Sequence, residues 1–169
     1  MNLSKSERLI LINQFLILEK FNPEEEKMYA LNRKILENGF VQNYNELFEW
    51  IPDNVPVAIT QEVWDILKMY HSLNLSFHAL EDHGDLKKEN VKFRGFDGQL
   101  EAIYMSYAKF VLHDLDKYDE IKDNAKYPNY QTDGPMLDKY RRMLAVWKGI
   151  SGKEHHELTL AEIRDVIGA

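Results

Sequence analysis

Histidine and tyrosine supply the side chains of this sequence that are best suited to chemistry. His71 and His78 lie seven residues apart, so on a helix they share a face but are separated by about 10 Å along its axis. A zinc–nitrogen bond is about 2 Å long, and one ion therefore cannot bind both. His155 and His156 stand in a polar stretch, where solvated histidines are ordinary. We therefore predict no metal site and no cofactor.

Tyrosine is unusually frequent, with nine residues in a chain of 169. Tyr70, Tyr104 and Tyr140 lie on or beside apolar stripes of helical spacing, and a buried tyrosine hydroxyl needs a hydrogen-bond partner. Together with His71 they form a candidate pocket for a small molecule. A polar seam inside a packed helical core would explain the same residues, and we prefer that interpretation.

The signatures of common catalytic sites are missing from the sequence. It contains no cysteine, which excludes thiol nucleophiles and disulfides. It also has no phosphate-binding loop, no dinucleotide-binding glycine motif and no G-x-S-x-G elbow. The acidic stretch from Asp114 does not match a calcium loop, because Asp119 stands where Gly is needed and Ala125 where Glu is needed. We predict no catalytic residue, and the sequence favours a protein that is not an enzyme.

Charge and hydropathy bear on partners and location. The formal charge of −7 argues against nucleic acid as a partner, and a recognition helix carrying Glu62 and Asp65 would suit DNA poorly. No apolar run reaches the roughly 20 residues of a membrane span. The stretch 9–18 lacks the basic start and the cleavage site of a signal peptide. We expect a cytoplasmic protein with no membrane partner.

The first helix is expected from a capping box of Ser4 and Glu7 to about residue 20. Its apolar residues leave no clean polar face, so such a helix is buried all round or is covered by another subunit. Ile10 and Ile17 of this helix, with Arg141 and Arg142 beside the apolar stripe near the C-terminus, form a candidate interaction surface. Arginine next to aromatic residues is favoured at interfaces, although a solvated face with an Asp138–Arg142 pair would also explain the basic residues. The expected partner is a second copy, in a homodimer or higher oligomer, or another protein.

Helical periodicity dominates the rest of the chain. The longest helix is expected over about residues 56–82, some 40 Å long, as a central strut. Other helices are expected over 22–38 with Gly39 at its end, after Asn43, over 98–118, and after the caps Asp133 and Thr159. No segment alternates with a convincing period of two. We predict an all-α fold, a compact multihelical single domain spanning residues 1–169, with about seven helices around the long central one.

The stretch "FRGFDGQLEAIYMSY", residues 93–107, places two glycines around an aspartate, as in a phosphate-binding loop. A phosphate loop usually continues with Lys or Ser/Thr, whereas Glu101 follows here and would repel the anion. We predict that Gly95 permits a left-handed turn and that Asp97 is a helix cap, accepting hydrogen bonds from the N–H of residue 99 or 100.

Four stretches, "EVWDILKMYHSLNLSFHAL", "VKFRGFDGQLEAIYMSYAKFV", "QTDGPMLDKYRRMLAVW" and "LTLAEIRDVIGA", resemble the YfbU-like family of small bacterial proteins. The resemblance covers nearly the whole chain and implies a compact multihelical domain in a bacterial cytoplasm. It carries over no catalytic residue. The function expected from the residues is that of a non-enzymatic protein-interaction or regulatory domain that self-associates. The alternatives are a sensor or enzyme with a Tyr/His-lined pocket and, disfavoured by charge, a DNA-associated regulator.

Overall fold

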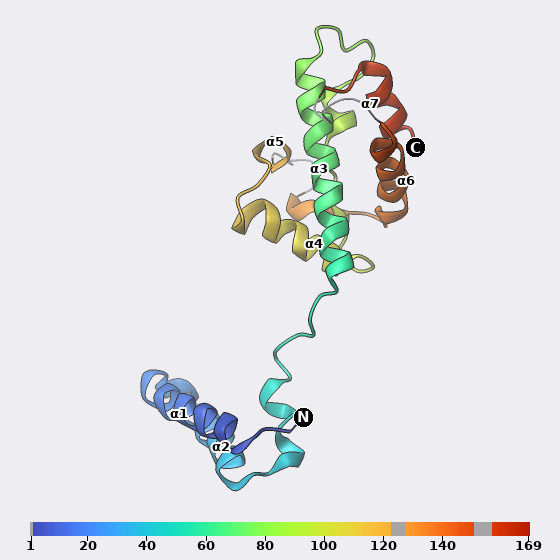
Figure 1. Ribbon diagram of the computed structural model, residues 1–169. Coiled ribbons are helices and arrows are strands. Elements are labelled where there is room, and N and C mark those ends of the chain that lie inside the picture. The colour runs from blue at the N-terminus through green and yellow to red at the C-terminus, as the bar shows by residue number, and fades with distance from the viewer. Residues whose placement is uncertain (1, 123–127, 151–156) are drawn as a thin grey trace. The chain divides into compact units, whose positions relative to one another are not determined.

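The computed structural model describes residues 2–122, 128–150 and 157–169 of the chain (Figure 1). The chain forms two compact units, Met1–Asn54 and Val55–Ala169. Seven α-helices and one two-stranded sheet are present in the described residues, which confirms the all-α fold class. Each unit has its own hydrophobic cluster, a division that the sequence does not predict. The single domain over residues 1–169 stays a prediction.

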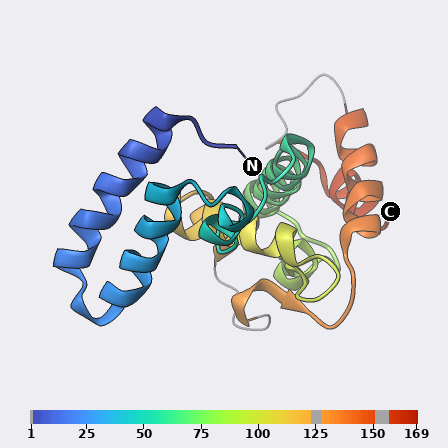
Figure 2. The ribbon, with the colours of Figure 1, turned by 90° about the horizontal axis from the view of Figure 1, so that it is seen from below.

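The N-terminal unit is built on a helical hairpin of α1 (Lys5–Phe21) and α2 (Glu26–Asn38), which lie side by side in Figure 2. A short 3-10 helix, Pro23–Glu25, joins them, and two more, Val41–Asn43 and Glu46–Phe48, follow α2. The predicted capping box is confirmed, because Glu7 N–H donates to Ser4 Oγ at 3.2 Å and Ser4 N–H donates to the Glu7 carboxylate at 2.8 Å. The predicted end of the second helix is also confirmed, with Gly39 at φ 68°.

The core of this unit is small. Its buried side chains all come from α2 and the segment after it: Ile35, Leu36, Tyr44 and Leu47. Helix α1 contributes no fully buried residue and covers this core only with half-buried apolar side chains. A unit of this size buries a small share of its surface and is marginally stable alone.

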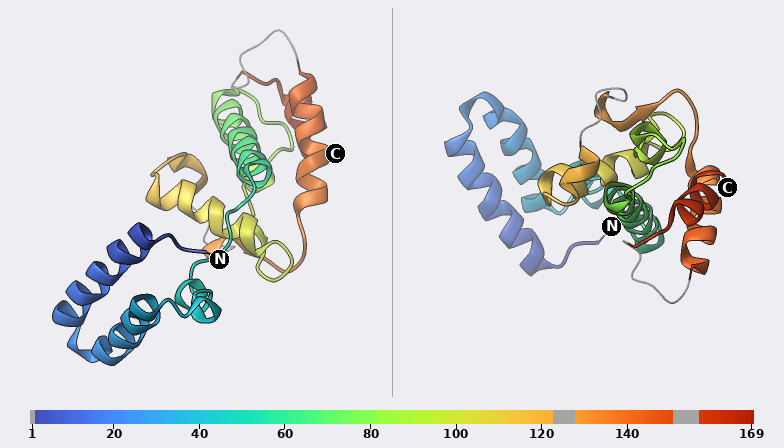
Figure 3. Two further views of the ribbon diagram at one scale, coloured as in Figure 1. Left: turned by 60° about the horizontal axis from the view of Figure 1, so that its bottom comes forward. Right: turned by 90° about the horizontal axis from the view of Figure 1, so that it is seen from above.

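The C-terminal unit is organised around α3 (Val57–Ala79), which confirms the predicted long helix. Its other α-helices are α4 (Ala102–Lys109), α5 (Asp119–Lys122), α6 (Leu137–Gly149) and α7 (Leu160–Ile167). Figure 3 shows α4, α6 and α7 grouped about α3. Their inward residues and those of α3 form the larger of the two hydrophobic clusters.

The predicted helix over 98–118 is shorter in the structure. Helix α4 begins at Ala102, because residues 98–100 form a turn, and it passes at Phe110 into a π-helical turn that ends at Asp114. Asp116 and Tyr118 then adopt positive φ angles of 53° and 57°. A left-handed backbone cannot continue a right-handed helix, which explains why the element stops before residue 118.

The glycine–aspartate stretch forms a turn beside a short parallel sheet of β1 (Phe96–Asp97) and β2 (Gln131–Thr132). Gly95 has φ 103°, as the left-handed prediction requires. Asp97 Oδ1 accepts from the N–H groups of Gln99 and Leu100 at 2.8 and 2.7 Å. The predicted hydrogen bonds are therefore present, but Asp97 is not the cap of α4: the bonds close the turn before the helix, and its N-cap residue is Glu101.

The prediction that Asp133 caps the helix after it is wrong. Helix α6 begins four residues later, at Leu137. Its N-cap residue is Met136, whose side chain makes no capping hydrogen bond. The start of α6 is capped instead by Glu101, whose Oε1 accepts hydrogen bonds from the N–H groups of Met136 and Leu137 at 2.8 and 2.7 Å. Its Oε2 receives the N–H of Asp97 at 2.9 Å. One buried carboxylate, 3% exposed, therefore joins the β1 turn to the start of α6.

Candidate functional site

Two residues of the predicted Tyr/His pocket, Tyr70 and Tyr140, lie inside the core of the C-terminal unit. Their rings are in edge contact, with centroids 5.5 Å apart. The Tyr140 hydroxyl donates to Gly95 O at 2.8 Å, and that of Tyr70 points at Met143 Sδ, 3.8 Å away. Burial raises the pKa of both phenols, because the phenolate would lose its hydration. These two tyrosines fit the interpretation preferred from the sequence, which is a polar seam inside a packed helical core.

The other two residues of that pocket, Tyr104 and His71, point elsewhere. Tyr104 donates to Glu62 Oε2 at 2.9 Å. His71 binds Glu120 through Nδ1, and its ring contacts Tyr118 with centroids 4.9 Å apart. Glu62 and His71 are nine residues apart on α3, which is about 13 Å along the helix axis. The structure therefore does not bring the four residues together.

Arg141 and Arg142, half of the predicted interaction surface, hold parts of the C-terminal unit together. The Arg141 guanidinium binds both oxygens of Glu62, at 2.7 and 3.1 Å, which ties α6 to α3. One turn further along α3, Asp65 pairs with Lys148 of α6. Arg142 donates to the backbone carbonyls of Asp138 and Ala169. Both arginines have partners within their own unit, so a structural role accounts for them.

The Arg141–Glu62 pair should make stability depend on pH in acid. Its guanidinium holds the pKa of Glu62 below the ordinary value of 4.5, against the opposing effect of burial. A carboxyl group whose pKa is lowered by folding stabilises the fold above its unfolded pKa and loses that contribution as the pH falls through its folded pKa. Because the Arg141 side chain is half exposed, we expect Arg141→Gln to lower the free energy of unfolding by about 0.5–1 kcal/mol at pH 7.

Urea unfolding at pH 7 and pH 3 checks this expectation. The difference between wild type and Arg141→Gln should be smaller at pH 3 than at pH 7, because Glu62 takes up protons as the pH falls through its lowered pKa. Lys88→Gln, at an exposed residue of the same unit, is the control for the loss of one positive charge. A deficit of the same size at both pH values would contradict the assignment to Glu62.

Ile10 and Ile17, the other half of the predicted surface, lie on α1 and are 60% and 50% exposed. Leu9 and Leu16 on the same helix are also exposed. We call these four residues the outer face of α1. It turns away from Leu11 and Phe15, which pack on the core of the N-terminal unit. The predicted surface is therefore divided between the units, and its two apolar residues, Ile10 and Ile17, belong to the outer face of α1.

A second feature of the N-terminal unit is an apolar groove of about 720 Å³. We call it the hairpin groove. It is lined by residues of α1, α2 and the segment after them: Leu11, Phe15, Leu18, Met28, Tyr29, Asn32, Glu46, Leu47, Phe48, Trp50 and Ile51. Trp50 is 80% exposed at its edge. No pattern in the sequence predicts this groove, whose only local signal is the pair of aromatic residues Phe48 and Trp50 near Glu46.

Among the described residues, no group of three His, Asp or Glu side chains could hold a metal ion. His155 and His156 lie outside the described residues. Across the part of the chain that the structure covers, no helix has both the length and the apolar character needed to cross a membrane.

Comparison with known proteins identifies relatives along the entire chain. A family model described as the YfbU domain matches residues 1–169. The chain is 34% identical to UPF0304 protein MS2240 of Mannheimia succiniciproducens, over a 173-residue alignment that covers all of both chains. It is 36% identical to UPF0304 protein MJECS11 of Methanocaldococcus jannaschii over 170 residues, or 99% of each chain.

Proposed function

We propose that this chain, which belongs to the YfbU domain family, is a non-enzymatic cytoplasmic protein that self-associates through the outer face of α1. The observation that carries the proposal is a 17-residue helix with no buried residue and four exposed aliphatic side chains on one face. A cluster of exposed apolar side chains of this kind marks interaction sites in soluble proteins. Covering it would also add buried area to a unit whose own core is small.

The spacing of the outer face favours a second copy as the partner. Leu9 and Ile17 lie four residues before and after Asn13, and Ile10 and Leu16 lie three residues before and after it. When two copies of α1 pack antiparallel about an axis at Asn13, each aliphatic residue meets an aliphatic residue of the other copy. This is the self-complementary arrangement that a twofold interface requires. The two Asn13 side chains would meet at the axis, where a polar residue in an apolar helix pair fixes the register.

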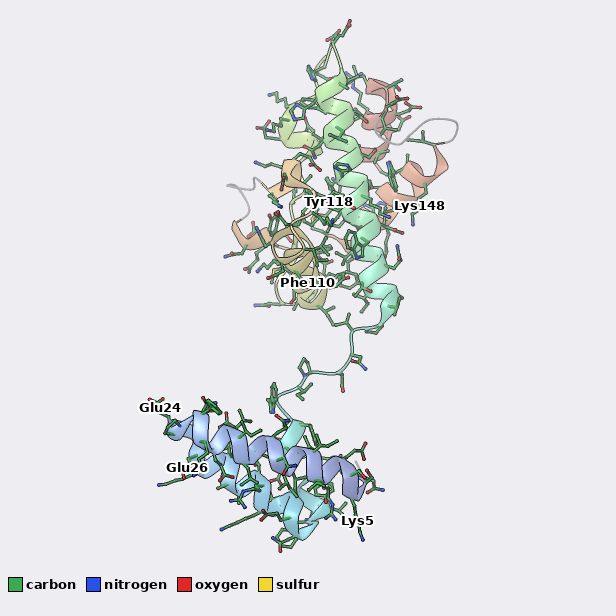
Figure 4. All side chains as sticks on the ribbon, turned by 60° about the vertical axis from the view of Figure 1, so that its left-hand side comes forward. Lys5, Glu24, Glu26, Phe110, Tyr118 and Lys148 are labelled. Atoms are coloured by element: carbon green, nitrogen blue, oxygen red, sulfur yellow. The ribbon has the colours of Figure 1, made fainter. Side chains whose placement is uncertain are left out.

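The charges at the two ends of α1 also favour the antiparallel arrangement. Figure 4 shows Lys5 at one end of the hairpin and Glu24 and Glu26 at the other. Antiparallel packing places Lys5 of each copy beside the acidic turn of its partner, whereas parallel packing brings the two acidic turns together. Complementary charges fix the register of an interface and repel wrong arrangements.

Sedimentation velocity at micromolar concentration tests the association. Wild type should sediment as a species heavier than the 20.0 kDa chain, and Ile17→Glu should sediment as a monomer, because a carboxylate would be buried in the apolar contact. Leu100→Glu introduces the same charge at a residue of the C-terminal unit that is 76% exposed and should leave the oligomer unchanged. A wild-type monomer, or equal effects of the two variants, would contradict the proposal.

Single cysteines test the arrangement, since the natural chain has none. In an antiparallel pair Asn13 lies at the twofold axis, so Asn13→Cys should form a disulfide-linked dimer under mild oxidation. Ser6→Cys lies seven residues away on the same face, and its sulfur should stay far from that of its partner. Equal cross-linking of both variants would indicate parallel packing.

A further inference from the structure

The hairpin groove carries an inference beyond self-association. We propose that it binds an amphipathic organic cation, meaning a quaternary or protonated centre on an apolar body. Its volume of about 720 Å³ falls within the range of small-molecule sites, roughly 300–1,000 Å³. Its lining includes Leu11 and the buried Leu47, and such a surface suits an apolar body.

Four aromatic side chains line the groove: Phe15, Tyr29, Phe48 and Trp50. The rings of Phe15 and Tyr29 lie side by side, with centroids 6.1 Å apart and planes tilted by 32°. The face of an aromatic ring carries negative charge density and attracts a cation placed over it, with Trp the best of these residues. Aromatic walls of this kind recognise quaternary ammonium groups, and Trp50 offers the groove a mostly exposed indole.

The charged side chain that lines the groove is negative. Glu46 is the charged residue among its lining side chains, and neither Lys nor Arg contributes to the lining. Asn43 Nδ2 donates to Glu46 Oε1 at 3.0 Å, and in the described part of the chain no donor is bound to Oε2. The carboxylate is thus held at the groove with one oxygen available to a ligand. A cation would be attracted both by Glu46 and by the rings, whereas an anion would be repelled by both.

The groove and the outer face of α1 use different sides of one helix. Leu11, Phe15 and Leu18 line the groove, while Ile10 and Ile17 point away from it. Ligand binding therefore does not need the oligomer, and the Ile17→Glu variant should bind the cation as wild type does. Failure of one proposal is in this way separable from failure of the other.

Tetraphenylphosphonium and tetraphenylborate are suitable probes, because they have nearly the same shape and opposite charge. Isothermal titration calorimetry on the 169-residue chain should show saturable binding of the phosphonium and at least tenfold weaker binding of the borate. Glu46→Gln should weaken phosphonium binding by about fivefold, the factor expected from one partly exposed charge contact. Trp50→Ala should weaken it by a similar factor, about fivefold, through the lost cation–π contact.

Glu49→Gln is the matched control. Glu49 lies three residues from Glu46 and is exposed, but it does not line the groove. The two variants change the net charge equally, so a general electrostatic effect would weaken binding equally in both. Such equality, equal affinity for the two probes, or no saturable phosphonium binding by a correctly folded wild type would each overturn the proposal.

Discussion

Gly95→Ala is expected to lower the free energy of unfolding by about 3 kcal/mol, because the new methyl group has no space and the backbone is in a conformation that favours glycine. A Cβ atom built at Gly95 would lie 1.9 Å from the carbonyl oxygen of Tyr130 and 2.6 Å from its Cα. These are backbone atoms, which cannot rotate away as the end of a long side chain does. Relief would require β2 to move away from β1, and with it the Tyr130 ring that contacts Phe93.

Urea unfolding followed by circular dichroism measures this loss. Gly134→Ala is the matched control, since a Cβ atom there would have no neighbour within 4 Å, and we expect it to change stability by less than about 0.5 kcal/mol. The Tyr140 hydroxyl donates to Gly95 O, so displacement of this backbone would also disturb the core. Equal stabilities of the two variants would show that the chain does not pass so close to residue 95.

Features that depend on neighbours in sequence were predictable. The capping boxes at Ser4 and Thr159 and the left-handed Gly39 each involve residues within four positions of one another, where backbone geometry fixes what can touch. The long helix α3 was predictable because its apolar residues repeat with helical spacing. The symmetric spacing of aliphatic residues about Asn13 can likewise be read from the sequence. That these residues face away from the hairpin core follows only from their exposure in the structure.

Features that depend on distant residues were not predictable. Tyr70 and His71 are adjacent in sequence, but consecutive residues of a helix point about 100° apart, so one enters the core and the other contacts Tyr118. The hairpin groove joins α1 to residues near Trp50, more than 30 positions later. No periodicity in a single segment shows where three segments leave a space between them.

Glu101 is the clearest case of a long-range role, and we expect Glu101→Ala to lower the free energy of unfolding by about 3 kcal/mol. Its carboxylate accepts three backbone N–H groups, from Asp97, Met136 and Leu137. A hydrogen bond to a charged group contributes about 1.5–3 kcal/mol, and a buried donor left without an acceptor costs about 1–3 kcal/mol. Water entering the vacated space would recover part of the loss, which is why the expected value is below the sum.

Glu101→Gln separates the roles of the two carboxylate oxygens. An amide oxygen can still accept from Met136 and Leu137, but the amide NH₂ would then face the N–H of Asp97, two donors in contact. In urea unfolding, we therefore expect the free energy of unfolding of Glu101→Gln to lie between those of wild type and Glu101→Ala. The control Glu89→Ala, at an exposed residue, should be close to wild type. Amide hydrogen exchange should be faster at Met136 and Leu137 in the Ala variant than in the Gln variant. Unchanged exchange at both amides in Glu101→Ala would mean that the start of α6 does not depend on this distant carboxylate.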